Sequence, residues 1–101
     1  MPVNIPYFTP DVSAGASAQA VSAAVALPGP TDGLVYITNL GPNDIAFKLG
    51  TSNAVSVTPS TGMVLLSGRS VIVGTGGVST YIALITLGGT LGATVNLTSG
   101  N

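Results

Sequence analysis

Short apolar runs follow one another along the chain from Leu34 onward, and Gly, Pro, Asn and Ser separate them. β-branched and aromatic residues dominate these runs, which is typical of strands. The pattern predicts strands at Leu34–Leu40, Ile45–Leu49, Ala54–Val57, Gly62–Leu66, Val71–Val73, Tyr81–Thr86 and Thr94–Thr98. With one more strand before them, there are about eight strands at a spacing of about 8 to 12 residues, which indicates an all-β sandwich or barrel with antiparallel neighbours.

The segment Ile45–Leu49 shows the clearest alternation. Ile45, Phe47 and Leu49 alternate with Ala46 and Lys48, so one face is apolar and the other carries the cation. We expect Ile45, Phe47 and Leu49 to face the core and Lys48 to face solvent. Turn residues on either side predict two hairpins, one joining 34–40 to 45–49 and one joining 81–86 to 94–98.

The first third of the chain has a different pattern of apolar and polar residues. Residues 1–16 lack an apolar period and place prolines at positions 2, 6 and 10, so they predict an extended N-terminal arm rather than a helix. Residues 17–27 contain alanines that suit a helix, yet apolar residues alternate up to Leu27, and we interpret the segment as a strand. The expected organisation is an arm at 1–16 and one antiparallel β-sandwich domain at 17–101.

The composition limits the chemistry. The chain of 101 residues has no His, Cys, Trp or Glu, and only five charged side chains, two basic and three acidic. Nucleophilic triads, thiol chemistry and most transition-metal sites lack their parts. The three carboxylates, Asp11, Asp32 and Asp44, stand beside turn residues, which favours turn and loop capping over a Ca²⁺ site or a catalytic pair. We expect no enzyme activity, no metal and no cofactor.

Nucleic acid and membrane are not expected partners. Two cations cannot neutralise several phosphates, which is the dominant contribution to nucleic-acid affinity. No run approaches the roughly 20 apolar residues of a membrane-spanning helix, and no basic region precedes an apolar block as in a secretion signal. The glycine-rich stretch at 74–77 leads into a predicted strand, so it indicates a hairpin loop rather than a phosphate-binding loop.

Three residues are candidates for contact with a partner: Tyr7, Phe8 and Arg69. Tyr7 and Phe8 stand between prolines, outside any alternating strand, so they either fold back onto their own domain or anchor to something else. Arg69 either serves solubility or pairs with an acidic group or a carbonyl on a partner.

The low charge is itself informative. Ser, Thr, Asn, Gly and Ala must cover most of the surface, and such a surface costs little to desolvate. A chain of this kind suits packing against neighbours, and self-association is expected. A neutral, rigid β domain with a small-residue exterior is the alternative.

Three stretches carry a resemblance to a known group: Gly33-Leu34-Val35-Tyr36-Ile37-Thr38-Asn39-Leu40-Gly41-Pro42-Asn43-Asp44-Ile45-Ala46-Phe47-Lys48-Leu49-Gly50, Thr80-Tyr81-Ile82-Ala83-Leu84-Ile85-Thr86 and Ala93-Thr94-Val95-Asn96-Leu97-Thr98-Ser99-Gly100. They resemble the small capsid cement or decoration proteins of tailed bacteriophages. In that group a strand ending in an Asn-x-Gly turn leads to a strand with an inward Phe and a closing Gly, and a Tyr-Ile-Ala sequence starts the C-terminal hairpin.

The resemblance implies a role in a virion. It implies a β-sandwich or jelly roll that binds the major capsid protein on the outer face of an icosahedral shell, commonly as a trimer, and stabilises the shell. Assembly would take place in the host cytoplasm. The alternative is a tail, baseplate or head-fibre component with a carbohydrate-binding role, for which Tyr36, Phe47 and Tyr81 are the aromatic candidates outside the arm.

Overall fold

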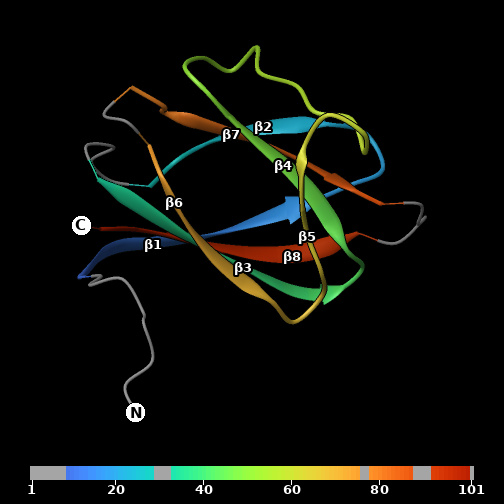
Figure 1. Cartoon of the computed structure of the whole chain (residues 1–101), viewed down its shortest axis with the longest axis horizontal. Helices are drawn as coiled ribbons and strands as arrows, with labels where there is room; N and C mark the ends of the chain where they lie inside the picture. The colour runs from blue at the N-terminus through green and yellow to red at the C-terminus, as the bar shows by residue number, and fades with distance from the viewer. Residues whose placement is uncertain (1–8, 29–32, 76–77, 88–91, 101) are drawn as a thin grey trace.

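The computed structural model describes residues 9–28, 33–75, 78–87 and 92–100. These residues form two four-stranded antiparallel sheets packed face to face (Figure 1). The strands are β1 (Pro10–Ala18), β2 (Ala23–Ala26), β3 (Leu34–Pro42), β4 (Ile45–Gly50), β5 (Met63–Leu65), β6 (Ser70–Gly74), β7 (Tyr81–Thr86) and β8 (Ala93–Gly100). The described residues contain no helix, so the all-β sandwich predicted from the sequence is confirmed.

The strand order is that of a jelly roll. Sheet A has the order β1-β8-β3-β6 and sheet B the order β2-β7-β4-β5. Consecutive strands therefore lie in opposite sheets at almost every step, the exceptions being β4 and β5, which pair directly. An eight-stranded double sheet wound in this way is a jelly roll, one of the two forms that the resemblance implied.

Both predicted hairpins are wrong. β3 lies in sheet A and β4 in sheet B, and the same holds for β8 and β7, so the connections cross from one sheet to the other. Near its end β3 bulges at Leu40, and Gly41 adopts a φ of 86°, a value that favours glycine; residues 43–44 then make the crossing. Turn residues identify where a chain reverses, but not which neighbour the next strand joins.

The main core lies between the two inner faces. Its fully buried members come from β3, β4, β7 and β8 and include Val35, Ile37, Ile45, Ile82, Leu84, Val95 and Leu97. Phe47 belongs to the same cluster at 3% exposure, Leu49 packs against it, and Lys48 is exposed. The alternation predicted for β4 is therefore confirmed.

A second apolar cluster covers the outer face of sheet B. Residues 51–62 connect β4 to β5 and fold back over that face, so Val57 packs with Ala46, Ala83 and Ile85. Ser22 Oγ accepts a hydrogen bond from the Val57 amide at 3.0 Å, which ties this loop to the connection before β2. The strand predicted at 54–57 is not one: its alternating valines pack the loop onto the sheet instead of pairing.

The loop can approach the sheet because it ends in a glycine. A Cβ added to Gly62 would lie 2.4 Å from Val57 Cγ2 and 3.0 Å from the Phe47 carbonyl oxygen. Gly62→Ala should therefore lower the free energy of unfolding by about 1 to 3 kcal/mol, the usual cost of overpacking. Urea denaturation measures this cost. Gly74→Ala is the matched control, because its added methyl group meets nothing within 4 Å.

The N-terminal boundary differs from the prediction. Residues 10–16, expected in the arm, belong to β1, which pairs with β8 along its whole length. The sequence did not indicate a strand here because the small side chains of β1 alternate little in size or polarity. Residues 17–27 are not one strand: Ala18 ends β1, and the chain then crosses to sheet B, where β2 begins at Ala23. The arm proper, residues 1–8, lies outside the described residues.

Candidate partner-binding surfaces

The three candidate contact residues do not converge on one described site. Tyr7 and Phe8 lie outside the described residues. Arg69 lies in the turn between β5 and β6, where it is exposed. Its backbone is structural: the amide donates to the Leu66 carbonyl at 3.0 Å, and its carbonyl accepts from the Asn39 amide at 2.9 Å. Within the described part of the chain, the guanidinium forms no ion pair or hydrogen bond.

The outer face of sheet A is an uncharged surface that spans four strands. The register places Ser13, Thr98, Tyr36 and Ile72 in one row across the sheet. The neighbouring row holds Gly15, Asn96, Thr38 and Ser70. We call these eight residues the hydroxyl face.

Most polar side chains of the hydroxyl face bond to one another. Thr98 Oγ1 donates to Asn96 Oδ1 at 3.0 Å, and Asn96 Nδ2 donates to Ser13 Oγ at 3.1 Å. Thr38 Oγ1 and Ser70 Oγ share a hydrogen bond of 3.1 Å. Because these groups already have partners, covering the face with a flat partner leaves them satisfied and costs little desolvation.

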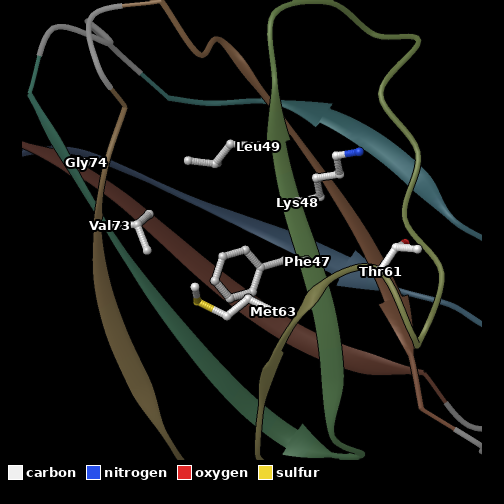
Figure 2. A pocket seen from close by; sticks show the side chains of 7 residues that line it. All are labelled: Phe47, Lys48, Leu49, Thr61, Met63, Val73 and Gly74. Atoms are coloured by element: carbon white, nitrogen blue, oxygen red, sulfur yellow. The ribbon is translucent and has the colours of Figure 1, made fainter.

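An apolar hollow lies on the side of the sandwich where β5 and β6 form the sheet edges. It has a volume of about 360 Å³ and is lined by Phe47, Lys48, Leu49, Thr61, Met63, Val73 and Gly74. Figure 2 shows the side chains of Phe47, Leu49, Met63 and Val73 converging between β6 and the β4–β5 pair, while Lys48 points away. Apart from Thr61 and the stem of Lys48, the lining is apolar, and Met63 is 56% exposed there.

The hollow exists because β5 is short. β5 pairs with β4 only from Ile45 to Phe47, so among the described residues no strand pairs with residues 48–50 on that edge. The opposite wall is β6, which pairs with β3 on one side and forms the edge of sheet A on the other. Two incompletely covered strand edges thus flank an apolar depression, an arrangement that favours an extended chain as ligand.

Asn39 is a buried polar residue whose role the sequence did not reveal. Its side chain is fully buried, and Nδ2 donates to the carbonyl oxygens of Leu65 at 3.0 Å and Asn43 at 2.9 Å. Oδ1 accepts from the Gly41 amide at 2.9 Å. This one amide joins the end of β3, the crossing to β4 and the end of β5. In the sequence, only the Asn-x-Gly spacing pointed to a special role for Asn39.

The carboxylates of the described ranges do not gather into a metal-binding cluster. They hold no group of three or more His, Cys, Asp or Glu that could bind a metal ion. Asp44 Oδ1 accepts a hydrogen bond from the Ser67 amide at 2.8 Å, which is the loop-capping role expected of it. Asp32 lies outside the described residues. Among the residues searched, no helix is long and apolar enough to cross a membrane.

Comparisons with protein-family models, with curated proteins and with solved structures gave no match to this chain. The functional argument therefore depends on the surfaces themselves.

Proposed function

We propose that this chain is a structural protein of a tailed-bacteriophage particle, which binds the major capsid protein on the outside of the shell and stabilises the shell as a homotrimer. The observation that carries the proposal is the hydroxyl face, a surface without a charged side chain that crosses all four strands of sheet A. Its outer neighbours include the exposed side chain of Leu40, which adds apolar area at the bulge of β3.

Many copies acting together explain how such a surface stabilises a shell. Each copy contributes a modest interface, and mass action over many sites raises the stability of the shell that carries them. Jelly rolls are frequent in viral capsid domains, and they also occur in lectins, so the fold agrees with the proposal by analogy only.

Carbohydrate binding is the rival function, and the structure offers it less support. Phe47 is buried in the core, which removes one of three aromatic candidates outside the arm. Tyr36 is 38% exposed on the hydroxyl face, but Asn96, Thr98 and Ser13 beside it bond to one another instead of pointing jointly at a ligand. A sugar site needs convergent polar groups around an aromatic platform.

Placement in the particle tests the proposal directly. Negative-stain microscopy of virions that carry a labelled form of the protein should show the label over the shell, and shells without the protein should withstand less heat than shells that carry it. Label confined to the tail, baseplate or fibres would reject the cement role and support the recognition role.

Substitutions on the hydroxyl face test the surface itself. The double variant Ser13→Lys/Ser70→Lys places charge on two exposed edge positions of the face and should weaken binding to purified shells at least tenfold. Co-sedimentation with shells measures this loss. The matched control is Ser60→Lys, an exposed position in the β4–β5 loop over sheet B, which should bind as the unmodified protein does. Equal binding by all three proteins would show that this face is not the interface.

A further inference from the structure

Residues 2–8 of the chain have a composition that suits the apolar hollow. They contain Pro2 and Pro6, which lack an amide donor, and the adjacent aromatic residues Tyr7 and Phe8. A cavity of about 150 Å³ suffices to bind benzene. The hollow, at about 360 Å³, therefore has room for two aromatic rings.

The chemistry of the lining matches this occupant. Met63 is exposed, Leu49 and Val73 are half-buried, and these three offer apolar side chains to a ring, while Phe47 lies almost fully buried beside them. Figure 2 shows that the charged group of Lys48 is directed away from them. Aromatic rings and the Met thioether attract one another beyond the area they bury. The unpaired edge of β4 at residues 48–50 adds backbone groups that an extended segment can bond.

The length of chain before Pro10 favours the hollow of a second copy over that of the same subunit. The register aligns Pro10 with Gly100, Leu34 and Gly74, so three strand spacings, about 14 Å, separate the start of β1 from the nearest wall of the hollow. Even in a fully extended chain, the Cα atom of Phe8 lies at most about 7 Å from that of Pro10, and the Cα atom of Tyr7 about 11 Å, so only outstretched side chains would approach the nearest wall. The far wall, Phe47 and Met63, belongs to sheet B, which packs about 10 Å from sheet A.

We therefore propose that residues 2–8 of one copy bind in the Phe47–Met63–Val73 hollow of a second copy, with Tyr7 and Phe8 as the anchors. This contact joins two different surfaces, so it is head-to-tail, and such contacts close into a ring when the rotation permits. A closed ring of three copies agrees with the proposed trimer. The inference goes beyond shell binding and does not require it, since it concerns the purified protein alone.

Cross-linking tests the contact, because the chain contains no cysteine of its own. Phe8→Cys protein is mixed with Met63→Cys protein under mild oxidation, and mass spectrometry identifies the mixed disulfide. The matched control replaces Met63→Cys with Val64→Cys, the next residue of β5, which is similarly exposed at 49% against 56% but lies on the opposite face of the strand. The Met63→Cys pair should form the mixed disulfide at least tenfold faster. Equal rates would overturn the proposal.

A double variant, Phe8→Cys/Met63→Cys in one chain, separates exchange between copies from contact within one copy. If arms bind between copies, the oxidised protein should remain as covalently linked oligomers under denaturing conditions. A bridge within single chains, with monomers as the product, would show that the arm binds its own subunit and would overturn the proposal.

Self-association gives a second measurement that depends on no new disulfide. Deletion of residues 2–8, which leaves β1 intact, and Met63→Lys should each weaken self-association at least tenfold in sedimentation at micromolar concentration. Val64→Lys should leave it unchanged, and circular dichroism confirms that each variant remains folded. If Met63→Lys protein associates as strongly as the unmodified protein, the arm contact is overturned. If the unmodified protein associates with itself but does not bind shells, that result counts only against the proposed function.

Discussion

Replacing Asn39 by Leu should lower the free energy of unfolding by about 3 to 5 kcal/mol. The new side chain is similar in size, but it leaves the Leu65 carbonyl oxygen and the Gly41 amide buried without the partners they have now. Each unsatisfied buried group costs about 1 to 3 kcal/mol, and a domain of this size is stable by only about 5 to 15 kcal/mol. Urea denaturation followed by circular dichroism measures the loss.

Asn39→Asp distinguishes the hydrogen bonds from the shape of the residue. An ionised carboxylate can still accept from Gly41, but it faces two carbonyl oxygens to which it cannot donate. Burial among acceptors raises the pKa of the new carboxyl above its unfolded value of about 3.9. The folded state then binds more protons than the unfolded state, so the stability of this variant should fall as pH rises through and above that value.

The control for both variants is Asn53→Asp, an exposed position in the β4–β5 loop. It should change stability by less than about 0.5 kcal/mol. If Asn39→Leu costs no more than this control, the three hydrogen bonds of Asn39 do not hold the strand ends together.

The strands could be predicted from the sequence where side chains alternate in size and polarity. Tyr81–Thr86 was predicted with its bounds, and the face on which Phe47 lies followed from its alternation with Lys48. β1 was missed because Ser, Ala and Gly alternate with too little contrast, although eight of its residues pair with β8. Valines at 55 and 57 alternate as in a strand, yet their partner is the outer face of sheet B rather than another strand.

The topology and the surfaces depend on contacts distant in sequence. Ser13 and Asn96 meet only because the first and last strands pair, and no local pattern predicts that pairing. Leu49 was expected in the core, but the sequence could not show that β5 is too short to cover it and leaves a hollow there. The low charge indicated an interface surface, and the register was needed to locate the hydroxyl face.

Phe47→Ala should lower the free energy of unfolding by about 3 to 5 kcal/mol, the usual range for a truncated core Phe. The ring is 3% exposed in the main core between the sheets. It also forms one wall of the hollow, so its removal joins the new cavity to that space, and the neighbouring side chains cannot close over it. The midpoint of urea denaturation should therefore decrease while the slope stays the same.

Lys48→Ala is the matched control, since it tests the register of β4 together with Phe47→Ala. In the observed register Lys48 faces solvent, and its truncation should cost less than about 0.5 kcal/mol. A slip of one residue would exchange the two faces, bury position 48 and expose position 47. A loss below about 1 kcal/mol in Phe47→Ala, together with a larger effect in Lys48→Ala, would therefore reject the register on which both the core and the wall of the hollow depend.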